Sequence, residues 1–459
     1  MLSCFAPRAG ADTVPIVPVT RDGFSKWTKS LSSASRTWLE QSGFTGEPGT
    51  HALIPDEKGK LARVAVGVEN AGHVFALGGL PMTLPARTYA LDADLDDGAA
   101  TRVALGWAMG AYAFTRYKKA KREAAKLVWP DGADRAQVEA QARAIYMARD
   151  LINTPAEDLG PSHLAEAAKV MARRHRARTE VIVGDALLKK NYPSIHTVGR
   201  AAANQPRLID IVWGSPRNPK VTLVGKGVCF DSGGLDIKPS GSMLMMKKDM
   251  GGSAAVLALG DMIMSANLKV RLRVMVPAVE NAISGNAFRP LDVITTRKGL
   301  TVEIGNTDAE GRIILCDALA EADSESPELI VDFATLTGAA RVALGPQLPA
   351  MYTNDDKFAA EWEKSAARAS DPIFRMPLWQ PYRKMLESKV ADLSSTGNSP
   401  FAGSITAALF LESFVSKKTT WAHVDTFAWN ATAQPGRPEG GEALGVRGLF
   451  QLLADRYGR

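Results

Sequence analysis

The sequence predicts two α/β domains: a C-terminal domain with a central mixed sheet flanked by helices, and a smaller N-terminal α/β domain. Length and composition are the first observation, because 459 residues, 46% of them hydrophobic, can bury a large core and exceed the usual size of one domain. The second is that strand-like and helix-like runs alternate along the chain. The third is the absence of a low-complexity tract or of a repeat of about 20 to 50 residues.

The N-terminal part contains both kinds of element. We expect strands in RVAVGVE (63–69) and HVFALGGL (73–80), and a helix in the Ala-rich stretch 100–119. The segment 133–155 has helical periodicity and stops at a proline, so it should bridge to the next domain. The predicted boundaries are residues 1–145 for the N-terminal domain, 146–160 for the end of the linker helix and 161–459 for the C-terminal domain.

Strand-like and helical runs alternate through the C-terminal part. This alternation is typical of a sheet covered by helices, in which loops at the strand ends supply the functional groups. The runs are 207–214, 220–227, 252–268 (helical), 269–280, 312–323, 328–336, 405–415 and 420–429.

Charge and cysteine content exclude some classes of protein. Lys and Arg number 55 against 49 Asp and Glu, a mildly basic balance that does not by itself indicate nucleic-acid binding. The three cysteines have no CxxC spacing, so we expect a reducing compartment, the cytoplasm, and no disulfide framework. No apolar run approaches the roughly 20 residues of a membrane span, and the N-terminus lacks the pattern of a signal peptide.

Charged residues interrupt an otherwise small and apolar stretch at 226–249. Lys226 follows a strand-like run, Asp231 begins a Gly-rich turn, and Lys238 comes shortly after it. Loops that leave strand ends often carry catalytic groups. Taken alone, however, an Asp-Ser-Gly-Gly turn is more often a solvated turn than a site.

A second cluster changes that balance. IGNTDAEGRIILCDAL (304–319) places Asp308, Glu310 and Arg312 at alternate positions immediately before an amphipathic helix. In an extended chain these side chains would project to one side, near a helix N-terminus that favours anions. An exposed edge strand is the alternative, but the flanking residues are apolar and indicate burial.

Carboxylates of both clusters suit divalent metal ions, which take oxygen ligands and, in two-metal sites, a shared carboxylate. Asp231, Asp249, Asp308 and Glu310 would balance two such ions. Lys226 could bind metal only as the neutral amine. The six histidines are scattered without a zinc-type spacing, so a metal site would be built mainly from carboxylates.

Three motifs resemble the leucyl aminopeptidase (M17, cytosol aminopeptidase) family: VGKGVCFDSGGLDIKPS (224–240), MKKDMGG (246–252) and NTDAEGR (306–312). The similarity extends from about Asn153 to the C-terminus. It implies a metal-dependent aminopeptidase that releases N-terminal residues from peptides, with two divalent ions, Zn²⁺ or Mn²⁺, per subunit. It assigns the ions to Lys226, Asp231, Asp249, Asp308 and Glu310, with Asp231 and Glu310 bridging.

The same resemblance implies a mechanism and an assembly. A metal-bridging water would attack the scissile carbonyl, Lys238 would stabilise the resulting oxyanion, and Arg312 would hold a bicarbonate ion as general base. Met246, Thr335 and Ala428 would line a pocket for Leu- or Met-like side chains. A homohexamer with its active sites facing an interior cavity is also implied.

Basic clusters leave one alternative function open. TRYKKAKREAAK (115–126) and MARRHRAR (171–178) could support a DNA-binding or scaffolding role, alone or beside peptidase activity. Solvated helix faces are routinely basic, however, and aromatic residues are not interleaved beyond Tyr117. The sequence therefore favours the peptidase.

Overall fold

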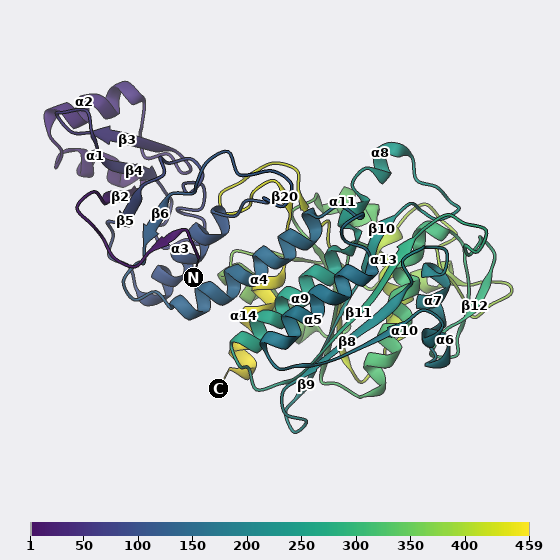
Figure 1. Ribbon diagram of the computed structural model, residues 1–459. Coiled ribbons are helices and arrows are strands. Elements are labelled where there is room, and N and C mark those ends of the chain that lie inside the picture. Colours follow the sequence, from purple (N-terminus) through teal and green to yellow (C-terminus); the bar gives the residue numbers. More distant parts are fainter. Residues whose placement is uncertain (1, 459) are drawn as a thin grey trace. The chain divides into compact units, whose positions relative to one another are not determined.

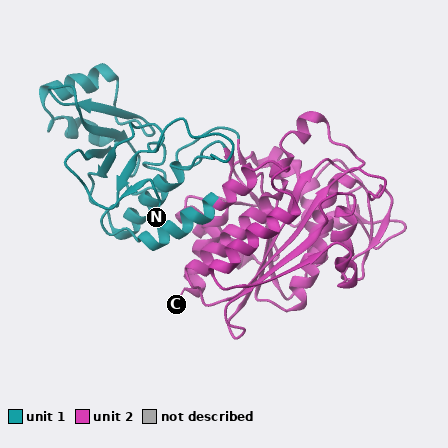
Figure 2. Ribbon diagram, viewed as in Figure 1, with its two compact units in different colours: residues 1–146, 431–439 teal, residues 147–430, 440–459 magenta. Residues whose placement is uncertain are grey.

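The computed structural model describes residues 2–458 and divides into two compact units (Figures 1 and 2). The first contains the chain up to Tyr146 together with residues 431–439, and the second contains residues 147–430 and the chain from Gly440 onward. Each unit combines a sheet with helices, which confirms the predicted α/β class. The inclusion of 431–439 in the first unit was not predicted.

The first unit is built on a six-stranded sheet with the order β1-β6-β5-β2-β4-β3. All neighbours in it are parallel except β3 and β4. Its strands are β1 (Phe5–Ala6), β2 (Val14–Val19), β3 (His51–Pro55), β4 (Leu61–Gly67), β5 (Thr88–Leu91) and β6 (Lys126–Val128). Its helices are α1 (Arg21–Thr28), α2 (Ser33–Ser42), α3 (Asp97–Gly110) and the first part of α4 (Arg135–Asn153).

Two local predictions for the first unit are wrong. Residues 73–80 form successive turns instead of a strand, because their backbone amides bond to carbonyls three residues back, as from Ala76 to His73 at 3.0 Å. The helix expected over 100–119 ends at Gly110, so residues 115–123 of the basic segment are exposed irregular chain and not a helix face, and the segment ends at the first residue of β6. The strand at 63–69 and the helix α4 are confirmed.

The second unit contains a nine-stranded mixed sheet. Its order is β16-β15-β18-β14-β9-β11-β8-β7, with β10 paired to β11. Strands β9, β10, β11, β14 and β18 run parallel to one another, and β8 and β15 run antiparallel to them. The edge strand β7 pairs antiparallel with β8. The bounds are β7 (Arg178–Val183), β8 (Arg207–Trp213), β9 (Lys220–Gly225), β10 (Gly227–Asp231), β11 (Arg271–Asn281), β14 (Leu329–Ala334), β15 (Ala350–Thr353), β16 (Phe374–Arg375) and β18 (Thr420–Asp425).

Helices cover this sheet, as Figure 1 shows. One continuous core joins α7, α10 and α13 to strand residues such as Val224 and Ile330. Helix α9 is buried from Gly251 to Met264 because it packs against β9, β14, α5 and α14. The helices are α5 (Pro161–Arg174), α6 (Ala186–Lys189), α7 (Pro193–Gly199), α8 (Ser240–Met243), α9 (Gly251–Ser265), α10 (Glu310–Ser324), α11 (Gly338–Leu344), α12 (Asp356–Arg368), α13 (Gly403–Glu412) and α14 (Val446–Tyr457).

Short elements complete the second unit. Strands β12 (Val293–Thr295), β13 (Thr301–Glu303) and β17 (Leu393–Ser394) form a small sheet, and β19 (Trp429–Asn430) pairs with β20 (Gly440–Gly441). Short 3-10 helices are η1 (Met246–Met250), η2 (Thr307–Ala309) and η3 (Gln380–Leu386). Two of them, η1 and η2, directly precede α9 and α10.

No helix between residues 2 and 458 is long and apolar enough to cross a membrane.

Candidate metal centre

The predicted site residues meet at the carboxyl ends of the parallel strands, where open α/β sheets usually bind ligands. Strand β10 ends at Asp231, Lys226 follows β9, and Asn281 ends β11. Because β9 lies between β11 and β14, segments about 100 residues apart in sequence are brought to one edge of the sheet.

Two helix N-termini supply the remaining carboxylates. Glu310 is the first residue of α10, and Asp249 lies in η1, directly before α9. The partial positive charge of a helix N-terminus stabilises a carboxylate there. Gly311 leaves room for the buried Lys226 side chain, since a Cβ at Gly311 would lie 2.7 Å from Lys226 Cε.

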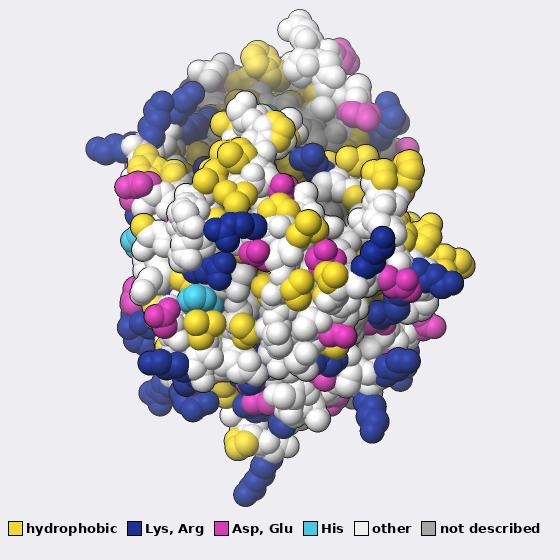
Figure 3. All heavy atoms as spheres, turned by 90° about the vertical axis from the view of Figure 1, so that its right-hand side faces the viewer, with side chains coloured by type: hydrophobic (Ala, Val, Ile, Leu, Met, Phe, Trp, Pro, Cys, Tyr) yellow, Lys and Arg dark blue, Asp and Glu magenta, His cyan; other side chains and the backbone are white. Residues whose placement is uncertain are grey.

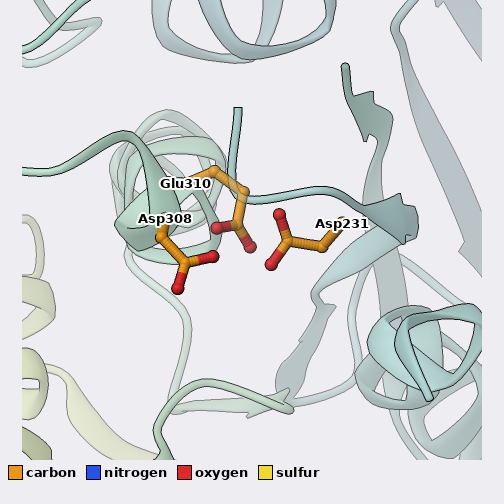
Figure 4. A group of neighbouring side chains, drawn as sticks. All are labelled: Asp231, Asp308 and Glu310. Atoms are coloured by element: carbon orange, nitrogen blue, oxygen red, sulfur yellow. The ribbon is translucent and has the colours of Figure 1, made fainter. Parts of the chain in front are cut away.

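Four carboxylates and two lysines form one cluster. The Nζ of Lys226 lies 2.7 Å from Asp249 Oδ2 and 2.8 Å from Glu310 Oε1. The Nζ of Lys238 lies 2.8 Å from Asp231 Oδ2 and also pairs with Asp308. Figure 4 shows the carboxylates of Asp231, Asp308 and Glu310 turned toward one another, and one oxygen of each lies within 4.8 Å of the others.

These carboxylates fit a divalent metal ion. Lys226 and Lys238 pair with these groups, but only two ammonium groups face four carboxylates, and Glu310 Oε2 has no hydrogen-bond partner. Burial and the nearby Asp231 raise the pKa of Glu310 well above its ordinary value. Burial and Asp249 raise the pKa of Asp231 to about 6. Buried carboxylates that outnumber their lysine partners and repel one another are stabilised by bound cations.

Neighbouring polar side chains orient the carboxylates. Asn281 donates to Asp231 Oδ1 at 2.8 Å and to the Thr307 carbonyl at 3.0 Å. Thr335 donates its hydroxyl proton to Asp249, and its carbonyl accepts from Lys226 at 2.9 Å. The sequence analysis missed Asn281 and this role of Thr335, although the ends of β11 and β14 were the signal that could have identified them.

The extended arrangement predicted for Asp308, Glu310 and Arg312 is wrong. Asp308 lies in η2, whereas Glu310 and Arg312 belong to α10, in which residues two apart differ by about 200° in direction. Arg312 donates to the Ser395 carbonyl at 2.8 Å. Its Nε has no hydrogen-bond partner, and burial lowers the pKa of Arg312 to about 10.

A cavity of about 380 Å³ opens beside the cluster. Five of the residues assigned to metal or catalysis line it, as do Met246 and Thr335. Ala428 is not among the lining residues: it is 1% exposed and has a φ of 55°. Its neighbour Phe427 lines the cavity instead, together with two further cations, Lys248 and Arg341. Burial lowers the pKa of Lys248 to about 8.

The site therefore has the form of a hydrolytic centre for divalent metal ions. The family model for the cytosol aminopeptidase family, catalytic domain, matches residues 146–450, and that for the M17 aminopeptidase N-terminal domain matches residues 14–130. The chain belongs to the cytosol aminopeptidase (M17) family, and it is a metal-dependent aminopeptidase, a hydrolase.

Individual relatives agree with this assignment. A probable cytosol aminopeptidase of Geobacter sp. (strain M21) is 37% identical over 94% of this chain and 93% of its own length. The crystal structure of the cytosol aminopeptidase from Coxiella burnetii is 48% identical, covers 99% of both chains and has a TM-score of 0.95. The bottromycin maturation enzyme BotP in complex with Mn is 34% identical, covers 97% of this chain and all of its own, and has a TM-score of 0.87.

None of these similarities supports the alternative of DNA binding. On the face drawn in Figure 3, Lys and Arg side chains (dark blue) lie in separate groups with Asp and Glu (magenta) among them. This face therefore carries no single continuous basic patch of the kind expected for DNA binding.

Proposed function

We propose that the chain binds two divalent ions through Lys226, Asp231, Asp249, Asp308 and Glu310, and hydrolyses the first peptide bond of peptides with a free α-amine. The observation that carries this proposal is the convergence of four carboxylates on one site with only two lysines to balance them. Bound ions would supply Lewis-acid activation of water and of the carbonyl at neutral pH. Mn²⁺ and Zn²⁺ are the ions we propose, and BotP, which is similar in structure, is a complex with Mn.

Lys238 and Arg312 are proposed as catalytic residues outside the metal shell. The Lys238 side chain is 13% exposed and lines the cavity, so its ammonium can donate to an oxyanion that develops there. Arg312 keeps a buried Nε–H without a partner, which supports a role in holding an anion. We propose bicarbonate as that anion and as the general base.

A homohexamer in the cytoplasm completes the proposal. Large apolar side chains are exposed on the second unit, and contact with other copies would remove them from water. They include Ile237, Leu244, Leu291, Val342 and Phe401. Light scattering of the purified protein measures the assembly directly, and a monomer at micromolar concentration would contradict it.

Metal analysis combined with peptide hydrolysis tests the central claim. Active, undialysed protein should contain two divalent ions per chain and should release leucine from a leucyl dipeptide. The N-acetylated dipeptide should be inert. Active protein with one ion or none would refute the binuclear site, and comparable rates on both peptides would refute the requirement for a free amine.

A further inference from the structure

One wall of the cavity is an aromatic ring flanked by two cations. The Nζ of Lys248 lies 4.5 Å from the centroid of the Phe427 ring, and the guanidinium carbon of Arg341 lies 5.1 Å from it. All three residues line the cavity. Stacking against an aromatic face stabilises a cation but leaves its N–H groups free to bind an anion.

These two cations differ from the other cations of the cavity. Lys226 and Lys238 are each paired with two carboxylates of the metal cluster. Within residues 2–458, by contrast, neither the Lys248 ammonium nor the Arg341 guanidinium takes part in an ion pair or a side-chain hydrogen bond. The wall therefore carries two cationic groups whose N–H groups are not engaged by a carboxylate of the described residues, although Asp249 and Asp425 lie near Lys248.

The loops that carry this wall are fixed. Asp425, at the end of β18, accepts hydrogen bonds from the backbone amides of Leu336 at 3.0 Å and Thr337 at 3.2 Å. Thr337 also donates its hydroxyl proton to Asp425 and caps α11, the helix of Arg341. Phe427 follows Asp425 by two residues. A positive wall held in this way is preorganised for an anionic group.

Burial indicates which part of a peptide meets the wall. Lys248 directly precedes Asp249 and is only 4% exposed, so it lies at the closed end of the cavity, beside the carboxylate cluster. In an aminopeptidase the rest of the peptide must leave through the open end. The side chain of the N-terminal residue is therefore the group that reaches Lys248 and Phe427.

We propose that this wall selects peptides whose N-terminal residue is acidic, Asp or Glu, with Arg341 and Lys248 binding the side-chain carboxylate and Phe427 contacting its methylene groups. The proposal rests on the aminopeptidase function above and differs from the Leu- or Met-like preference predicted from sequence. That prediction counted Ala428 as a pocket residue and did not consider Phe427's two cationic neighbours.

Matched substrates test the proposal. For the wild-type holoenzyme we expect kcat/KM to be at least about tenfold higher for Glu-Ala-amide or Asp-Ala-amide than for their Gln and Asn counterparts, since a charge-assisted hydrogen bond discriminates by at least that factor. Free glutamate should also inhibit leucyl-peptide hydrolysis more strongly than free glutamine. In Arg341→Met, both acid-to-amide ratios should fall about tenfold, and Lys248→Met should lower them in the same direction.

Two control variants make the same side-chain changes elsewhere on the second unit. Lys417→Met and Arg217→Met remove exposed cations that do not line the cavity, so they should keep the wild-type ratios. Ratios near one in the wild type, or ratios that Arg341→Met leaves unchanged, would overturn the proposal. It would also be overturned if Arg341→Met lowered kcat/KM for Leu-Ala but not for Leu-Ala-amide, because Arg341 would then bind the C-terminal carboxylate of the peptide and not the side chain of its N-terminal residue. Absence of any hydrolysis, of leucyl peptides included, would instead refute the aminopeptidase function itself.

Discussion

Replacing Glu310 by Gln should separate metal binding from folding. The change keeps the shape of the side chain but removes one of the four negative charges. Glu310 is 1% exposed and forms a buried ion pair with Lys226, whose Nζ lies 2.8 Å from Oε1 and also pairs with Asp249, while Oε2 has no hydrogen-bond partner. Repulsion from Asp231 and Asp308, whose oxygens lie within 4.8 Å, is relieved. Because Lys226 keeps Asp249 as its second partner, the lost ion pair and the relieved repulsion should largely offset each other, and the metal-free variant should be within about 1 kcal/mol of the metal-free wild type.

Added metal should stabilise the folded wild type more than the folded Glu310→Gln variant. An ion present at 1,000 times its Kd stabilises the folded wild type by about 4 kcal/mol. Loss of a direct ligand should weaken binding at least about 100-fold, which removes about 2.7 kcal/mol of that stabilisation. At about 1.5 °C per kcal/mol for a unit of this size, the rise in Tm on adding Mn²⁺ should be smaller in Glu310→Gln by about 4 °C.

Thermal unfolding of chelator-treated protein, titrated with MnCl₂, measures both quantities. Glu363→Gln is the matched control, because Glu363 is exposed on α12 and does not line the cavity. The reasoning would be refuted by a metal-free Glu310→Gln protein that is clearly less stable than wild type. An unchanged shift in Tm with Mn²⁺ would refute the assignment of Glu310 as a ligand.

Three further predictions concern single residues. Lys238→Met should retain bound metal by elemental analysis but lose about 100- to 1,000-fold in kcat, because an oxyanion donor is removed; a metal-free variant would contradict this role. Gly311→Ala should lower the free energy of unfolding by about 1–3 kcal/mol and reduce activity, because its Cβ would lie 2.7 Å from the buried Lys226 side chain. The control Gly285→Ala, whose Cβ would have nothing within 4 Å, should leave the free energy of unfolding unchanged in the same assay. Burial raises the pKa of Asp317 from 3.8 to about 6, so the folded state holds this proton more tightly than the unfolded state does. The contribution of Asp317 to the free energy of unfolding should therefore decrease by about 3 kcal/mol as the pH rises from 3.8 through 6. The stability difference between wild type and Asp317→Asn, measured by denaturant unfolding, should therefore shrink between pH 4 and pH 7, and a constant difference would contradict the shift.

The sequence by itself determined the fold class, most strands and helices of the second unit, and the chemistry of the proposed ligands. Residues 224–240, 246–252 and 306–312 are short local runs, so the identities and spacing of their charged residues can be recognised without a structure. Long periodic segments such as α4 and α9 were equally recognisable, because their helical pattern is repeated over several turns.

Tertiary structure decided how these groups meet. The order of the sheet places β14 between β9 and β18, and this arrangement brings Thr335 to Asp249 and the turn at Phe427 to Lys248. It also decided the helical path of 308–312, the turns at 73–80 and the inclusion of 431–439 in the first unit. These features depend on contacts between segments far apart in the chain, and the pattern of residues within one segment cannot specify them.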